Sequence, residues 1–381
     1  MFENVQQGPV DPMFDLKKLA DNDTSPEKVD LGVGIYRNEN GQYHEMEAIK
    51  EYESTTGNPQ FLEYAAQIMF GEKCEALVSG QITSVQTISG TGANHLAALF
   101  LKRCSGSKAN SVYLGTPTWG NYEPLCSLVG MDIVKYPYLD PESGTVNFDT
   151  LLEMVSQAPP QSVFILQACC HNPLGVDLTQ SQWRKLANAM KEASVFPFFD
   201  IAYQGLGGSQ EEDAYAIRLF TEMGFEMVVC QSFSKNFGLY GERCGVLHVV
   251  CSTATIAAKV YDQLRCLIRW EFASSPAYGS RLVNLIMESP RLRQLCELSL
   301  MRSRILDNRR ELFRLLKHVP GDWNMILATK GLFCCLPLSL LQCEQLQSKH
   351  RIYLPGNGRI NISGLNSTNI DRVASAIVDV L

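Results

Sequence analysis

Five short apolar runs constrain the fold of this 381-residue chain more than any other feature. They are Val112–Leu114, Val163–Leu166, Phe196–Phe199, Met227–Cys230 and Val246–Val250. Each run is short enough to be a strand buried on both faces, and helical patterns separate the runs from one another. The sequence therefore predicts an α/β protein with a mostly parallel central sheet flanked by helices.

Three segments show helical periodicity. In Thr179–Ala193, Thr179 and Gln182 have the spacing of a capping box, ahead of apolar residues at i, i+3, i+4 and i+7. Apolar residues recur at helical spacing over Leu292–Leu316, which predicts one extended helix with arginines on its other face, long enough to bridge two lobes. The pattern over Thr368–Leu381 predicts a C-terminal helix on a smaller lobe.

Charge and cysteine usage exclude several classes of protein. With 33 basic and 40 acidic residues the net charge is −7, which argues against a non-specific grip on nucleic acid or anionic lipid. No apolar stretch is long enough to cross a bilayer, and the first residues lack a targeting pattern, so we expect a soluble cytoplasmic protein. The 13 cysteines lack CxxC spacing and the six histidines lack HxxxH spacing, which favours a reducing compartment and predicts no metal site.

Polar sequences follow the apolar runs, where parallel strands bring their carboxyl ends to one edge of the sheet. The turn SGTGANH at 89–95 precedes a helical pattern, and its backbone N–H groups with the hydroxyls of Ser89 and Thr91 could hold a phosphate. Taken alone, such a turn is an ordinary entry into a helix. It also lacks the lysine of a nucleoside-triphosphate P-loop.

Two charged residues at these strand ends carry possible chemistry. Lys235 follows an apolar strand between small polar residues, where desolvation would lower its pKa and favour a Schiff base. Asp200 ends the run Phe196–Phe199, and a buried carboxylate there needs a partner such as a protonated pyridine nitrogen. Each has a simpler alternative, a solvated lysine in a loop and an aspartate that caps a helix.

The polar sequences together, in this order and at these separations, resemble the aspartate aminotransferase family of fold-type I pyridoxal-phosphate enzymes. The resemblance extends from LGVGIYR at 31–37 to GRINISGL at 358–365, and SFSKNFGLYGER at 232–243 is specific to this group. It implies an N-terminal arm (1–11), a small domain (12–45 and 300–381) and a large cofactor-binding domain (46–299). It also implies a homodimer with composite active sites.

The resemblance implies roles for individual residues. Lys235 would hold pyridoxal phosphate covalently and then move the substrate's Cα proton, Asp200 would keep the ring nitrogen protonated, and Tyr203 would bond the phenolic oxygen. The other cofactor-binding residues would be Ser89, Gly90, Thr91, Trp119, Asn172, Ser232, Arg243 and, from the partner subunit, Tyr52. Arg359 would bind the substrate's α-carboxylate and Arg269 of the partner subunit the distal one, with Gly34, Trp119 and Asn172 also contacting substrate.

The chain departs from the family pattern at several points. The segment between residues 37 and 52 is shorter than in family members, and Tyr122 stands where a histidine is usual. Gln167 and Leu174 replace a common histidine and threonine, and Ala273–Pro276 replaces the usual S-N-P-P. These changes lie close to the cofactor ring and the distal carboxylate, so they bear on substrate preference.

The function implied is transfer of the amino group from L-aspartate, or a similar acidic amino acid, to 2-oxoglutarate, giving oxaloacetate and L-glutamate. One alternative is a pyridoxal-phosphate enzyme of the same fold that takes aromatic or other amino donors. Another is a non-catalytic relative, which only the shortened segment favours. A nicotinamide-dependent dehydrogenase is disfavoured because no GxGxxG follows an early strand.

Overall fold

The computed structural model describes residues 2, 3, 5, 6, 22, 24, 54–105, 111–141, 143–295 and 297–381. A seven-stranded sheet in the order β1-β7-β6-β5-β4-β2-β3 forms its centre. The strands are β1 (Ile82–Ile88), β2 (Ser111–Thr116), β3 (Asp132–Pro137), β4 (Val163–Gln167), β5 (Phe196–Ile201), β6 (Met227–Ser232) and β7 (Cys244–Val250). Neighbouring strands pair in parallel except at β7, which runs antiparallel to both β1 and β6. The predicted α/β class with a mostly parallel sheet is confirmed.

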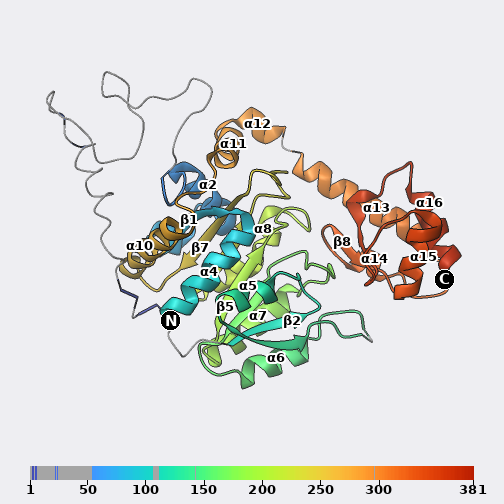
Figure 1. Cartoon of the computed structure of the whole chain (residues 1–381), viewed down its shortest axis with the longest axis horizontal. Coiled ribbons are helices and arrows are strands. Elements are labelled where there is room, and N and C mark those ends of the chain that lie inside the picture. The colour runs from blue at the N-terminus through green and yellow to red at the C-terminus, as the bar shows by residue number, and fades with distance from the viewer. Residues whose placement is uncertain are drawn as a thin grey trace.

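Helices cover both faces of the sheet (Figure 1). Alternate residues of one strand enter different cores: Val163 and Ile165 pack with α4 (Ser89–Ser105), α5 (Tyr122–Leu128) and α10 (Ala254–Glu271). Phe164 and Leu166 pack on the other face with α6 (Phe148–Gln157), α7 (Gln180–Glu192) and α9 (Tyr215–Glu222). This two-sided burial explains why the strands read as continuous apolar runs. The remaining helices beside the sheet are α2 (Pro59–Phe70), α3 (Glu75–Val78), α8 (Gln210–Asp213) and α11 (Ala277–Glu288).

The C-terminal elements form a separate group on one side of the sheet (Figure 1). They are α13 (Leu298–Leu316), α14 (Met325–Ala328), β8 (Phe333–Cys335), α15 (Leu340–His350), β9 (Arg359–Asn361), the 3₁₀ turn η1 (Ile362–Gly364) and α16 (Ile370–Val380). Strands β8 and β9 pair antiparallel. The predicted domain boundary at 299/300 falls inside α13, and the arm and the segment 12–45 lie almost wholly outside the described residues.

The helix predictions had mixed outcomes. The capping box of Thr179 and Gln182 at the start of α7 and the C-terminal helix are confirmed. The single helix over Leu292–Leu316 is wrong: α12 (Pro290–Gln294) ends before α13 begins at Leu298. The break between Gln294 and Leu298 is so short that the apolar residues on either side keep their helical spacing, and the periodicity of the sequence therefore does not reveal it. Among the described helices, none combines the length and the apolar character needed to span a bilayer.

Candidate active site

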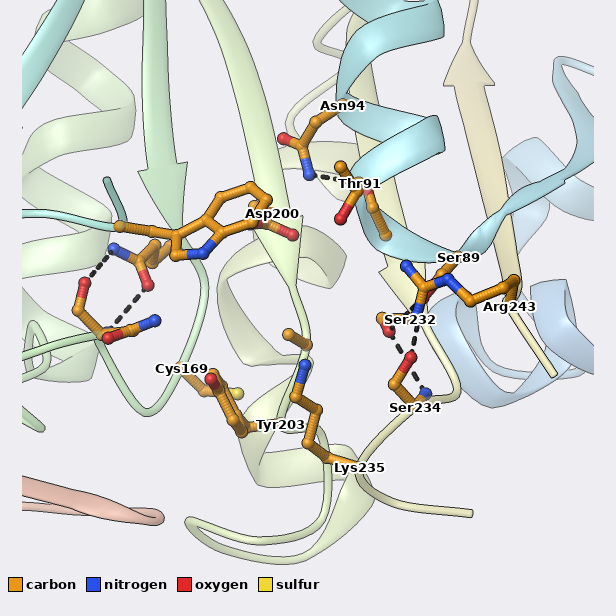
Figure 2. A pocket seen from close by; sticks show the side chains of 15 residues that line it. Ser89, Thr91, Asn94, Cys169, Asp200, Tyr203, Ser232, Ser234, Lys235 and Arg243 are labelled. Atoms are coloured by element: carbon orange, nitrogen blue, oxygen red, sulfur yellow. Dashed lines mark hydrogen bonds between the residues drawn. The ribbon is translucent and has the colours of Figure 1, made fainter. Parts of the chain in front are cut away.

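A pocket at the carboxyl edge of the sheet collects the polar residues that follow the strands (Figure 2). Its lining is Ser89, Gly90, Thr91, Asn94, Trp119, Gln167, Cys169, Asn172, Asp200, Ala202, Tyr203, Ser232, Ser234, Lys235 and Arg243. Strands β2, β4, β5 and β6 point the same way, so the loops after them meet at this edge. Side chains far apart in the sequence therefore face one space.

One end of the pocket is an anion cup, by which we mean Ser89, Ser232, Ser234 and Arg243. Ile88 pairs with Cys244 in the β1–β7 register, so the next residues outward, Ser89 and Arg243, lie side by side and share a backbone hydrogen bond of 2.9 Å. The Ser89 hydroxyl lies 2.7 Å from that of Ser234 and 3.3 Å from that of Ser232. Helix α4 begins at Ser89, so its free N–H groups also point into the cup.

Two residues of the anion cup hold unusual backbone conformations. Ser89 has φ 59° and Arg243 has φ 51°, both in the left-handed region that side chains other than glycine rarely adopt. Strain of this kind persists where surrounding contacts fix the backbone, and it concentrates at functional sites. The cup combines hydroxyls, helix N–H groups and a guanidinium, which is the donor set that a phosphate group requires.

Asp200 stands at the opposite end of the pocket, near the end of β5 (Figure 2). Its Oδ2 accepts a hydrogen bond of 2.5 Å from the Tyr122 hydroxyl. Burial raises the pKa of Asp200 to about 6, whereas the hydrogen bond from Tyr122, the Asn94 amide and the charge of Lys235 all lower it. At neutral pH this carboxyl is largely ionised in a poorly solvated place, where a cationic partner would stabilise it.

Lys235 follows β6, and Figure 2 shows its side chain below Asp200 and to the left of the anion cup. Its ammonium nitrogen is 5.6 Å from the centre of the Tyr203 ring. Burial lowers its pKa, the charge of Asp200 raises it, and the charge of Arg243 lowers it. A partly desolvated amine with a lowered pKa is a better nucleophile and base than a solvated lysine.

Asn172 connects the pocket to the C-terminal group of elements. The side-chain amide of Gln167 holds the main chain of Asn172 through two hydrogen bonds. Its Oε1 accepts from Asn172 N at 2.8 Å, and its Nε2 donates to Asn172 O at 3.1 Å. The side-chain Oδ1 of Asn172 accepts from the Arg359 guanidinium at 3.0 Å. Arg359 also lies over the Phe333 ring, 4.5 Å from its centre. The other guanidinium N–H groups of Arg359 have no partner among the described residues, so they can receive a carboxylate.

The structure brings most of the sequence-predicted residues together. Ser89, Gly90, Thr91, Trp119, Asn172, Asp200, Tyr203, Ser232, Lys235 and Arg243 line the pocket. Arg359 lies beside it, through Asn172. Arg269 is exposed at the end of α10 and does not line the pocket of its own chain. Gly34, Tyr52 and the shortened segment between residues 37 and 52 lie outside the described residues.

Sequence reasoning missed four pocket residues, namely Asn94, Cys169, Ala202 and Ser234, and named Gln167 only as a departure from the family pattern. Ser234 precedes Lys235 directly, so its place in the cup could have been suspected. Asn94 is in the second turn of α4, where its amide donates to Gly90 O at 2.8 Å. No local pattern marks an asparagine inside a helix as part of a pocket, because the packing of α4 on the sheet decides where it points.

A cluster beneath the pocket has atoms of the kind that bind metals. Among the described residues, the Sγ atoms of Cys169 and Cys170 and a carboxylate oxygen of Asp213 lie within 4.8 Å of one another. Asp213 already accepts hydrogen bonds from the backbone of Gly205 and Gly207. The hydrogen bond that the Cys169 thiol donates to Cys170, together with burial, raises the pKa of Cys169 well above its usual value, which keeps it a neutral thiol. The contacts of this cluster anchor a loop.

Comparison with known proteins agrees with this geometry. Residues 26–377 match the family model described as aminotransferase class I and II. The chain is 45% identical to aminotransferase tasG of Hapsidospora irregularis, over 99% of this chain and 95% of that one, and 40% identical to the mitochondrial aspartate aminotransferase of Dictyostelium discoideum, over 99% and 92%. An aromatic-amino-acid aminotransferase from Burkholderia pseudomallei, solved covalently bound to pyridoxal phosphate, superposes with a TM-score of 0.85 at 35% identity, covering 100% and 99%.

Proposed function

Because this chain belongs to the class I and II aminotransferases and is therefore a pyridoxal-phosphate-dependent transaminase, we propose that its amino donor is L-aspartate or a similar acidic amino acid. The acceptor is 2-oxoglutarate, and the products are oxaloacetate and L-glutamate. One observation carries the amino-acid part of the proposal: the free donors of Arg359 lie next to a pocket that fits the cofactor, where they can bind an α-carboxylate. An arginine whose guanidinium has free N–H groups can bind a carboxylate through two parallel hydrogen bonds. The preference for an acidic side chain rests on Arg269, which is exposed at the end of α10.

The residues of the pocket fit pyridoxal phosphate. When bound, the cofactor supplies an electrophilic aldehyde carbon and an electron-accepting ring. The anion cup and the start of α4 hold its phosphate, with Gly90 and Thr91 beside them. Asp200 at the other end supplies the negative charge that a protonated ring nitrogen needs. An uncharged ligand would leave both ends of this pocket without a charged partner.

Each remaining residue has one task in the proposal. Lys235 attaches the cofactor through Nζ and, once displaced by substrate, takes the Cα proton at the same atom. Tyr203 and Asn172 donate to the phenolic oxygen of the ring. Trp119, held by an edge-to-face contact with Tyr122 at 5.1 Å between ring centroids, packs against the ring face and excludes water.

The distal carboxylate of the substrate is bound across a homodimer. Arg269 is exposed and makes no hydrogen bond or ion pair within the described chain, although it is next to the exposed Trp270. A guanidinium of this kind is available to a second subunit. In the proposal, Arg269 and Tyr52 reach the partner's pocket, so that the two active sites are composite and the monomer is inactive. Gly34 contacts substrate from the small domain.

A second candidate is the same reaction with aromatic donors. The region after Arg269 favours it, because Ala273 carries no polar side chain and the Ser275 hydroxyl is already bonded to Gln86 O at 3.0 Å. Fewer free polar groups near Arg269 weaken its preference for a carboxylate over an aromatic ring. A non-catalytic role is disfavoured, because Lys235, Asp200 and Arg359 are all present around the pocket.

The visible spectrum of the cofactor-loaded protein separates these candidates. The spectrum is recorded before and after addition of L-aspartate, and separately of L-tyrosine, with no 2-oxo acid present. Conversion of the cofactor to its amine form by L-aspartate alone supports the proposal. Conversion by L-tyrosine alone favours the second candidate, and a protein that does not bind the cofactor would be a non-catalytic relative.

A cytoplasmic location completes the proposal. Every described cysteine is a free thiol, including the adjacent pairs Cys169–Cys170 and Cys334–Cys335. Free thiols in this number suit a reducing compartment. Microscopy of the tagged full-length chain tests the assignment, and a mitochondrial signal would contradict it.

A further inference from the structure

Tyr122 does not itself line the pocket, but it contacts two residues that do, Asp200 and Trp119. It is the first residue of α5, only 1% exposed, and its hydroxyl donates to Asp200 Oδ2. The edge of the Tyr122 ring also meets Trp119, with an interplanar angle of 86°. One side chain thus contacts both the acid and the aromatic residue that would face the cofactor ring.

Asn94 approaches the same carboxyl group from α4 (Figure 2). It is 3% exposed, and its Nδ2 donates to Gly90 O at 2.8 Å, which fixes the orientation of the amide. Its Oδ1 has no hydrogen-bond partner among the described residues, although it is buried at the pocket. A buried acceptor without a partner costs free energy, so its presence here points to a group that the pocket receives.

The charges around Asp200 show what these two side chains do. The titratable groups facing it are Tyr122 from α5, Lys235 and Tyr203 from the loops, and Cys230 from β6. Burial favours the neutral acid, and the Tyr122 hydroxyl and the Asn94 amide oppose that effect. Burial and the charge of Asp200 raise the pKa of Tyr122 well above its usual value, so it donates throughout the physiological pH range.

We propose that Tyr122 is a positioning residue which, together with Asn94, holds Asp200 ionised and oriented toward the ring nitrogen of the cofactor. The inference rests on the role proposed for Asp200. A histidine at this position, as is usual in the family, titrates near neutral pH, whereas a tyrosine does not. In this chain, the hydrogen bond that Tyr122 donates to Asp200 is therefore available throughout the physiological pH range.

The test measures binding of pyridoxamine 5′-phosphate, which cannot react covalently with Lys235, so that its affinity reports the non-covalent contacts. Quenching of tryptophan fluorescence gives the dissociation constant for the cofactor-free protein at pH 6, 7 and 8. Tyr122→Phe keeps the ring and its contact with Trp119 and removes the hydroxyl alone. A hydrogen bond to an ionised group corresponds to about a tenfold effect or more, so we expect about tenfold weaker binding at pH 7. The loss of affinity relative to the wild type grows toward pH 6, because Asp200 without the Tyr122 hydroxyl takes up a proton at a higher pH.

Tyr138→Phe is the matched control. It removes a hydroxyl that donates to Val176 O at 3.0 Å, from another buried tyrosine that does not line the cofactor pocket. Asn94→Leu is a second variant, which removes the amide at similar size, and we expect a smaller loss with the same pH trend. Wild-type affinity in both Tyr122→Phe and Asn94→Leu, or losses equal to that of Tyr138→Phe, would overturn the inference. Failure of the wild type to bind the probe would instead refute the role proposed for Asp200.

Discussion

Replacing Gly245 with alanine places a methyl group against the main chain of the anion cup. Gly245 lies in β7 opposite Thr87 of β1 and Ser232 of β6. A Cβ built there would be 2.5 Å from the carbonyl carbon of Ser89 and 2.8 Å from its Cα and its oxygen, well inside the 3.0 Å that real Cβ atoms keep. Ser89 cannot rotate away, because the obstacle is backbone. It must move as a whole, and the start of α4 moves with it.

Overpacking of this kind costs about 1–3 kcal/mol. Because the displaced atoms belong to the anion cup proposed to hold the phosphate, we expect the cost to appear as an affinity for the cofactor lower by roughly 5- to 150-fold. The assay is a fluorescence titration with pyridoxal phosphate, together with thermal melting of the cofactor-free protein. Gly241→Ala is the control, since its Cβ would meet no atom within 4 Å. If Gly245→Ala matches Gly241→Ala in both measurements, the close packing of β7 on Ser89 does not matter for binding.

Three further predictions concern charged residues. Lys235→Ala should abolish the visible band of the covalently held cofactor while leaving the fold intact by circular dichroism; an unchanged band would refute covalent attachment there. Asp200→Asn should stabilise the cofactor-free protein at pH 8 by up to about 3 kcal/mol, since the pKa of Asp200 rises from 3.8 to about 6 on folding. A carboxyl group whose pKa is raised by folding destabilises the fold above pH 6 and not below pH 4. Chemical denaturation should therefore show that the stability gained by Asp200→Asn disappears toward pH 4. A gain in stability that does not change with pH would exclude the raised pKa of Asp200 as its cause. Arg269→Ala should lower kcat/KM for dicarboxylates by about a hundredfold and for aromatic amino acids only severalfold, and equal losses would mean that Arg269 does not bind the distal carboxylate.

Five of the seven strands were predictable from the sequence because a continuous apolar run is a local pattern, whereas β1 and β3 carry polar residues and show no such run. A parallel strand that is buried on both faces must be apolar along its whole length, and the run ending at Asp200 is an instance. Parallel neighbours then bring their following residues to one edge, which is how Lys235 and Asn172 come to share a pocket. Asn94 and Ser234 escaped notice because they reach the pocket through the packing of α4 and through a turn, which leave no periodic signal.

Arg309 shows most clearly what periodicity cannot reveal. The Leu292–Leu316 pattern predicts arginines on the outer face of the helix, yet Arg309 is 1% exposed. Its guanidinium donates to the carbonyls of Ile326, Gly331 and Phe333 and to the Thr329 hydroxyl. A buried guanidinium is costly unless its donors are used. Here both terminal nitrogens donate to the loop that enters β8, whereas Nε has no partner among the described residues.

That loop is where the C-terminal elements meet the pocket. Phe333, held through its carbonyl by Arg309, carries the ring over which the Arg359 guanidinium lies, and Cys335 pairs with Arg359 in the β8–β9 register. Lys330 N also donates to Gly175 O at 2.7 Å, which joins the loop to the segment that follows Asn172. Arg309 therefore fixes, mainly through main-chain carbonyls, the position from which Arg359 reaches Asn172. Its burial is explained by the carbonyls of a loop that turns too sharply to pair them within a sheet, a requirement set by the tertiary fold and absent from the helix's own sequence.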